Sequence, residues 1–261
     1  MKKTCSNCVA SNLPVNRESG QGSVEFIVVF TLFALLITGL FEMTRVFRTK
    51  HTLNHATFKA ARIGAVNHAL IEPMESELAN NMSELFIRGE RSLEGLAAAT
   101  ARARAFGEVV SGFGGGIKII SPTRRVFNQL SINQRIRRTD TEEFDVVAVI
   151  PNDNLRWRPR RVASLAGGGS INLQDANLLK VRSVWCHRLI VPVLDRVVFK
   201  IVHDPLLGGG KSDAQRVCKA LSDDPDKYSD GDDPEVYKFF IAITSDATIR
   251  MQSPVVVDDL L

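Results

Sequence analysis

One carboxylate carries the chemistry that stands out in this sequence of 261 residues. Glu25 lies five positions after Gly20 and directly before an uncharged apolar run, Phe26–Phe41. An acidic side chain inside a bilayer costs about 2.5–3.5 kcal/mol by insertion scales, so it needs a partner of opposite charge. The alternative is a carboxylate in the first turn of a helix, which the helix dipole stabilises by roughly 0.3–1 kcal/mol.

The four cysteines fall into two pairs with different chemistry. Cys5 and Cys8 form a CxxC near the N-terminus, but this half-site lacks the four ligands that structural zinc needs. Cys186 and Cys218 lie in the part of the chain that we expect to be exported, where disulfides persist. A bridge between them would close a loop of about 33 residues and stabilise the fold by roughly 3–4 kcal/mol. Two buried free thiols are the alternative.

An acidic loop near the C-terminus is the candidate metal site. Calcium prefers several oxygen ligands from a flexible loop. The EF-hand pattern fails here, because Tyr228 and Tyr237 stand at two of its ligand positions. A solvated acidic loop is therefore the main expectation, with calcium binding as the alternative and no other cofactor expected. The candidate ligands are Asp224, Asp226, Asp230, Asp232 and Asp233.

No group of residues forms a coherent catalytic set. Residues 205–212 resemble a phosphate loop, but Pro205 occupies the position of its first glycine. Cys186 and His187 are neighbours in a predicted strand, so their side chains point to opposite faces and do not cooperate. We therefore predict a protein that is not an enzyme.

The net charge of +4 gives little reason to expect a nucleic-acid partner. The first twenty residues hold three basic residues and one acidic residue, which contribute +2 and leave the rest of the chain near +2. The sequence contains no RNP-like or helix-turn-helix pattern. A basic, aromatic segment, Arg156–Arg161, is expected as a solvated loop, with lipid head groups, the acidic loop or another subunit as alternative contacts. We predict no nucleic-acid binding.

The apolar run determines how the chain relates to a membrane. Phe26–Phe41 would measure roughly 24 Å as a helix, and Val24 and Met43 extend it towards the ~30 Å hydrocarbon layer. We therefore predict a transmembrane segment at about residues 24–43, rather than a buried core helix. Small residues precede the run instead of following it, so cleavage after Gly20 would remove a hydrophilic leader and leave the apolar helix attached.

The remaining pattern predicts an α+β head on a long N-terminal helix. This helix is expected over residues 22–68, and a second helix over 73–110 with a break near 87–89. Strands are expected at 117–120, 144–150, 178–184 and 189–202, a helix at 212–221, and a closing hairpin of strands 239–244 and 248–252. The predicted domains are a leader at 1–20, the N-terminal helix at 21–69 and a head with a mainly antiparallel β part at 70–261.

The segment that begins at Gly20 resembles a known family. A glycine, four residues and a glutamate before an apolar helix form the type IV prepilin leader pattern, which implies cleavage by prepilin peptidase between Gly20 and Gln21. Further segments are similar to the TadE-like family, the minor pseudopilins of the tight-adherence (Tad/Flp) pilus machinery. This chain differs from the family in a longer leader that carries two cysteines. The similar segments are GQGSVEF at 20–26, Glu42, and residues 60–65, 176–181 and 249–254.

The resemblance implies a non-enzymatic subunit that assembles through its N-terminal helix. It implies one pass through the bacterial inner membrane, a cytoplasmic N-terminus and a periplasmic head, with incorporation into the pilus as a further option. The implied partners are prepilin peptidase, other pilins or pseudopilins, the inner-membrane pilus machinery and the lipid bilayer. Glu25 would pair with the new α-amino group of Gln21 in a neighbouring subunit. The alternative is an uncleaved single-pass receptor or adhesin with an exported ligand-binding head.

Overall fold

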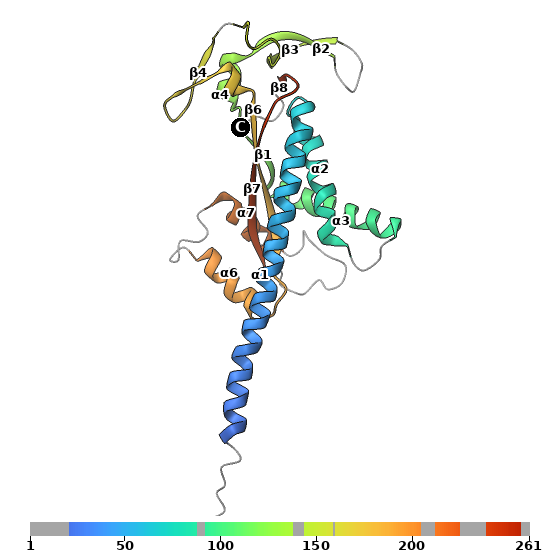
Figure 1. Cartoon of the computed structure of the whole chain (residues 1–261), viewed down its shortest axis with the longest axis vertical. Coiled ribbons are helices and arrows are strands. Elements are labelled where there is room, and N and C mark those ends of the chain that lie inside the picture. The colour runs from blue at the N-terminus through green and yellow to red at the C-terminus, as the bar shows by residue number, and fades with distance from the viewer. Residues whose placement is uncertain are drawn as a thin grey trace, which may run out of the picture. The chain divides into compact units, whose positions relative to one another are not determined.

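The computed structural model describes residues 21–87, 92–137, 144–158, 160–204, 212–224 and 239–256. Contacts divide the chain into two compact units, Met1–Phe41 and Glu42–Leu261. The helices are α1 Gln21–Val66, α2 Ile71–Met82, η1 Ser83–Phe86 (a 3₁₀ turn), α3 Leu93–Gly112, α4 Arg124–Leu130, α5 Leu173–Ala176, α6 Leu194–His203 and α7 Asp213–Asp223. The strands are β1 Gly116–Ser121, β2 Ile132–Arg137, β3 Phe144–Ile150, β4 Val162–Ser164, β5 Ser170–Asn172, β6 Leu178–Arg188, β7 Phe240–Arg250 and β8 Val255–Val256 (Figure 1).

The described strands form three antiparallel sheets, with the orders β1-β6-β7, β2-β3-β8 and β4-β5. In the first of these, β6 is the central strand and pairs with β7 over its full length, from Leu178 opposite Arg250 to Arg188 opposite Phe240. Together with the helices, these sheets confirm the predicted α+β class. The predicted domain boundaries at residues 20, 69 and 70 remain predictions.

The side chains of β6 alternate between the two faces of its sheet, as strand geometry requires. Ser183 and His187 contact α1, whereas Cys186 is bonded to Cys218 of α7. Both sets are buried. The central strand is therefore covered by α1 on one face and by α7 on the other.

Aromatic rings fill the core between α3 and this sheet. The ring of Phe106 lies 5.0 Å from that of Trp185 and 6.0 Å from that of Phe240, measured between centroids. Phe86 of η1 lies 6.3 Å from Trp185 in an edge-on arrangement. Tilted pairs at such distances add about 0.5–1.5 kcal/mol each to the effect of area burial. These contacts fix α3 and η1 to β6 and β7.

One predicted strand and one predicted hairpin turn are wrong. Residues 189–202 form the connection after β6 and most of helix α6, because Pro192 lacks the N–H of a strand and the apolar residues that follow repeat at helical spacing. The hairpin predicted around residues 245–247 is one continuous strand, β7, because every residue from Phe240 to Arg250 has a partner in β6.

The other predicted elements agree more closely with the structure. The predicted helix at 73–110 corresponds to α2, η1 and α3, and Ile87 leaves the helical conformation where the break was expected. Strands 117–120 and 144–150 and helix 212–221 correspond to β1, β3 and α7. The sequence pattern does not indicate α4, β2 or the β4–β5 hairpin.

Candidate functional site

The predicted processing site lies at the start of α1. Gly20 lies outside the described residues, and α1 begins at Gln21. Glu25 is exposed, in the second turn of the helix. Its position one turn inside the helix, at the edge of the apolar run, leaves its carboxylate accessible to a group from another molecule.

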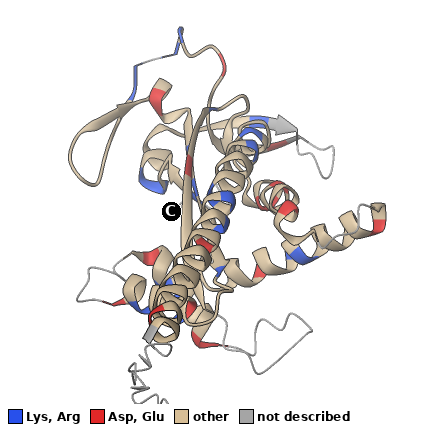
Figure 2. Ribbon diagram, turned by 60° about the horizontal axis from the view of Figure 1, so that its bottom comes forward, with Lys and Arg blue, Asp and Glu red and all other residues tan. Residues whose placement is uncertain are grey.

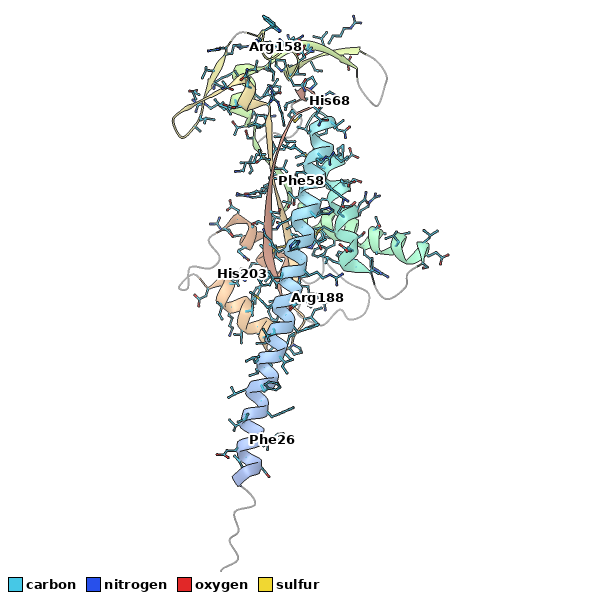
Figure 3. All side chains as sticks on the ribbon, in the orientation of Figure 1. Phe26, Phe58, His68, Arg158, Arg188 and His203 are labelled. Carbon is cyan, nitrogen blue, oxygen red and sulfur yellow. A yellow bond between two sulfur atoms is a disulfide. The ribbon has the colours of Figure 1, made fainter. Side chains whose placement is uncertain are left out.

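The apolar half of α1 exposes its hydrophobic side chains on all sides. Among the described residues, α1 is the single helix that is long and apolar enough to cross a membrane. Phe26, labelled in Figure 3, points away from the helix axis. Most of the apolar residues that follow it in this unit are also exposed. Thr31 and Thr38 donate their hydroxyls to the carbonyls of Ile27 at 2.7 Å and Ala34 at 2.9 Å. Such internal bonds meet the requirement of a lipid environment, where no water satisfies polar groups.

The later half of α1 belongs to the second unit and packs on the rest of that unit through small residues. Ala56, Ala60, Ala61 and Ala65 are fully or almost fully buried. A Cβ atom at Gly64 would lie 2.3 Å from Met74 Sδ and 3.3 Å from Leu179 Cδ2, so this glycine permits a close approach to α2 and β6. The small residues of segment 60–65 thus allow α1 to pack closely against α2 and β6.

The three later segments of the family resemblance meet at the end of α1. The carbonyl of Ala65 accepts hydrogen bonds from the backbone N–H groups of Gln252, at 2.9 Å, and Ser253, at 3.0 Å. The N–H of Met251 donates to the carbonyl of Asn177 at 2.9 Å, which joins the 249–254 segment to the 176–181 segment. Residues far apart in the chain therefore hold the end of α1 in place.

Polar side chains also join α1 to β6 and β7. Thr49 Oγ1 lies 2.9 Å from His187 Nδ1, and Thr57 shares a hydrogen bond with Ser183. Lys50 donates to the carbonyl of Thr244 in β7. Buried hydrogen bonds of this kind are directional, so they fix the rotation and register of α1 on the sheet.

One family model matches part of this chain. The matched segment includes Gly20, Glu25, the apolar half of α1 and most of its packed half. Residues 20–62 match the TadE-like protein family. This match confirms the predicted resemblance over residues 20–62. No curated protein and no solved structure matches the chain. The family therefore accounts for α1 up to Arg62, and the sheets that α1 packs on lie outside the matched segment.

The TadE-like segment contains a buried acidic residue, Glu42, whose contacts could not be predicted from the sequence. Glu42 is 5% exposed, and its Oε1 lies 3.4 Å from Arg45 Nη1 and 3.7 Å from His187 Nε2. Burial, and secondly the charge of Arg45, lower the pKa of His187 to about 4. The imidazole is therefore neutral at pH 7, and its contact with Glu42 is not an ion pair. The one signal in the sequence is Glu42 itself, an acidic residue directly after an apolar run.

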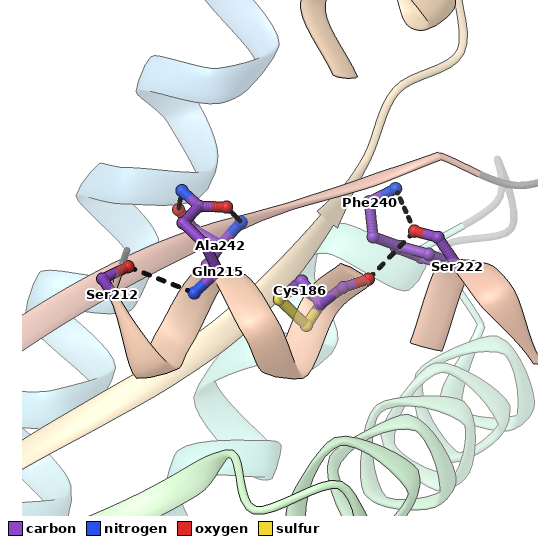
Figure 4. The surroundings of a disulfide bond; sticks show 7 residues. Cys186, Ser212, Gln215, Ser222, Phe240 and Ala242 are labelled. Atoms are coloured by element: carbon purple, nitrogen blue, oxygen red, sulfur yellow. Dashed lines mark hydrogen bonds between the residues drawn. A yellow bond between two sulfur atoms is a disulfide. The ribbon is translucent and has the colours of Figure 1, made fainter. Parts of the chain in front are cut away.

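The disulfide pair lies across the central sheet from the TadE-like segment. Cys186 and Cys218 are bonded, which joins β6 to α7 (Figure 4). Gln215 accepts a hydrogen bond from the N–H of Ala242 at 3.1 Å and donates to its carbonyl at 3.4 Å. Ser222 accepts from the N–H of Phe240 at 3.0 Å. Helix α7 thus covers backbone groups along the free edge of β7, which would otherwise invite pairing with another chain.

The remaining candidate sites lie partly or wholly outside the described residues. Of the candidate calcium ligands, Asp224 follows the end of α7, while Asp226, Asp230, Asp232 and Asp233 are not described. The phosphate-loop-like segment is described at Ser212 alone, which caps α7 through Gln215 N at 3.2 Å. Within the described ranges, no three His, Cys, Asp or Glu side chains gather as a metal site.

The basic segment Arg156–Arg161 is described except at Pro159. Trp157 is exposed, with the guanidinium of Arg156 5.6 Å from its ring centroid, and Arg158 pairs with Asp153 at 2.7 Å. Figure 2 shows acidic and basic residues interspersed over the ribbon in this view. The absence of nucleic-acid binding stays a prediction.

Proposed function

We propose that this protein is a minor pseudopilin of a Tad-type pilus, a structural subunit that assembles through α1. One observation carries the proposal: the TadE-like match covers a helix whose first half exposes apolar side chains and Glu25, while its second half is packed on a folded head. This division suits a subunit that is held in the bilayer by one end and presents a domain with the other.

The proposed assembly step depends on cleavage after Gly20 by prepilin peptidase. Cleavage creates a positively charged α-amino group on Gln21, four residues before Glu25. A carboxylate such as Glu25 costs about 2.5–3.5 kcal/mol in lipid, and a neighbouring subunit that presents its new amine would offset this cost. The pairing would favour side-by-side association of apolar helices.

The proposed location is the bacterial inner membrane, with the leader in the cytoplasm and the head in the periplasm. The Cys186–Cys218 bond supports an exported head, because disulfides persist in oxidising compartments. Other pilins or pseudopilins and the inner-membrane machinery are the proposed partners. The subunit would act in initiating or gating pilus export and would carry out no catalysis.

The substitution Glu25→Val tests the assembly step. Removal of the carboxylate removes the partner of the new amine, so we expect normal cleavage and membrane insertion with reduced piliation. Thr31→Val is the matched control, because its hydroxyl bonds within its own helix at 2.7 Å and has no assembly role here. Pili are measured in sheared fractions, and cleavage is measured by immunoblot of membranes.

Three results separate the proposal from its rival. Reduced piliation in Glu25→Val with full piliation in Thr31→Val supports assembly through Glu25. Normal piliation in Glu25→Val contradicts the pairing. An uncleaved wild-type chain that copurifies with no pilus subunit would favour the single-pass receptor or adhesin.

A further inference from the structure

Helix α6 has a solvent-facing side on which apolar and basic residues alternate. The exposed residues recur at the spacing of one helix face, three and four positions apart. Three of them are large and apolar: Val193 is 64% exposed, Val197 49% and Ile201 52%. The exposed residues of this α6 face, in chain order, are Val193, Arg196, Val197, Lys200 and Ile201.

The opposite side of α6 is held by the protein. The ring of Phe199 lies 5.0 Å from that of Phe239, next to β7, and 4.2 Å from that of His203. His203 is buried, and its Nδ1 lies 3.0 Å from the carbonyl of Phe199. The α6 face is therefore not a frayed segment, because the helix is fixed in place with this side turned outward.

The α6 face adjoins a basic pocket in the second unit. Ile190, which precedes α6 and is 53% exposed, lines a pocket of about 290 Å³ together with Arg45, Arg48 and Arg188. Figure 3 shows Arg188 beside α1 and His203 on α6, at the same end of this unit. Ile190 lies three residues before Val193, so the chain keeps the start of the α6 face within about 11 Å of the pocket.

The pocket lies close to the first residue of the second unit, because Glu42 lies 3.7 Å from His187, which lines the pocket. Glu42 is the first residue of the unit, and Phe41, the last residue of the run, precedes it on the same helix. At 1.5 Å per residue, Arg45 and Arg48 lie roughly 6 and 10 Å along α1 from Phe41. The pocket and the start of the α6 face therefore lie close to Glu42, the residue that directly follows the apolar run.

We propose that the α6 face lies in the membrane interface and binds anionic phospholipid. An interfacial helix buries its apolar side about 5–10 Å into the boundary between head groups and acyl chains, and its basic residues attract anionic lipid. Both kinds of residue share the α6 face, and the charges of Arg196 and Lys200 are complementary to those of anionic head groups. This inference rests on the proposed membrane anchoring of α1 and adds a second contact with the bilayer.

Spin labels on the full chain test this contact. Cys5→Ser and Cys8→Ser remove the leader thiols, and one cysteine is introduced at a time for a nitroxide: Val197→Cys on α6, Val146→Cys as control, and Leu36→Cys in the apolar run. Val146, in β3, is a matched exposed valine at 69% exposure. The chains are reconstituted into vesicles of phosphatidylethanolamine and phosphatidylglycerol, and accessibility to oxygen and to a water-soluble nickel complex is measured.

We expect the label at position 197 to lie about 5–10 Å below the interface, with preferential access to oxygen, and the label at 146 to report water. Equal, aqueous behaviour at 197 and 146 with a lipid signal at 36 overturns the inference and leaves the anchor intact. Shielding of the 197 label from both reagents, with spin–spin broadening, also overturns it in favour of a second copy. An aqueous signal at 36 overturns the anchoring itself.

Charge substitutions test the lipid class. Arg196→Gln with Lys200→Gln should reduce the ratio of docked to undocked α6 by up to about thirtyfold, at roughly fivefold for each basic residue near an anionic surface. The pair Arg124→Gln and Arg125→Gln, also exposed but in α4, is the control and should leave the ratio unchanged. An equal response of both pairs, or an unchanged depth in vesicles of phosphatidylcholine alone, contradicts the role of anionic lipid.

Discussion

At the residue scale, the contacts that fix α1 to the head are polar as well as apolar. Thr49 and Glu42 approach one histidine, His187, from two turns of the helix. A polar group that is buried in this way is costly when its partner is removed, by about 1–3 kcal/mol. The cluster therefore makes the position of α1 on β6 specific.

His187 gives the head a dependence on pH. Its pKa is lowered to about 4 from the ordinary 6.5, so in the range between these values the unfolded chain binds a proton that the folded chain does not. Stability is therefore full above pH 6.5 and falls as the pH drops towards 4, by on the order of 3 kcal/mol. His187→Gln should remove this part of the pH dependence, as measured by urea unfolding of the detergent-solubilised chain.

The exposed histidine His55, on α1, provides the control for that measurement. His55→Gln should leave the wild-type pH dependence in place, including the parts due to carboxylates. An identical pH dependence in the wild type and His187→Gln would mean that the buried imidazole does not resist protonation.

The sequence predicts some of these residues and not others. The spacing of Gly20 and Glu25 is local, so it could be recognised without a structure. The contact between Glu42 and His187 could not be predicted, because it joins residues that are far apart in the chain. The alternation of side chains along a strand indicates only on which face of the sheet His187 lies.

At the element scale, α7 completes the central sheet. Its side chains bond backbone groups of β7, its N-terminus is capped by Ser212, and Cys218 bonds it to β6. All of these links involve one helix of 11 residues, which would be only marginally stable as an isolated helix in water. Tertiary contacts therefore determine whether α7 forms.

Cys218→Ser should destabilise the head by roughly 3–4 kcal/mol, because a closed loop of about 33 residues becomes free in the unfolded chain. The denaturation midpoint in urea measures the change, and reduction of the wild type should lower the midpoint to the same extent. Cys5→Ser in the uncleaved chain is the control, since this thiol lies in the predicted leader and outside the closed loop. A midpoint that is unaffected by reductant would contradict a bridge between Cys186 and Cys218.

The elements that sequence patterns could predict are those with local signals. Strand β3 has a continuous branched apolar run, and the helical conformation ends at Ile87, the first residue of a short Ile-Arg-Gly segment of the sequence. Helix α6 was expected as a strand because its valines and isoleucines favour strands by propensity; their helical spacing after Pro192 indicates a helix, which the packing of Phe199 on Phe239 stabilises. The continuity of strand β7 could not be predicted locally either. Residues 245–247 have a turn-like sequence, Ser-Asp-Ala, but each of them pairs with a residue of β6.

At the scale of the whole molecule, the sequence of α1 serves two environments. Its first half is apolar on all sides and its second half is lined with alanine and glycine, so one helix has the composition of a membrane segment and then of a packed core helix. The family match ends at residue 62, within the second half. The sheets and the other helices therefore lie outside the segment that is similar to TadE-like proteins.

The central claim is that the chain is processed after Gly20 and remains anchored by α1. Mass spectrometry of the protein from membranes tests this most directly. We predict an N-terminal peptide that begins at Gln21, in the membrane fraction, with the apolar run retained. An N-terminus at Met1, or one that begins beyond Phe41, would contradict the account.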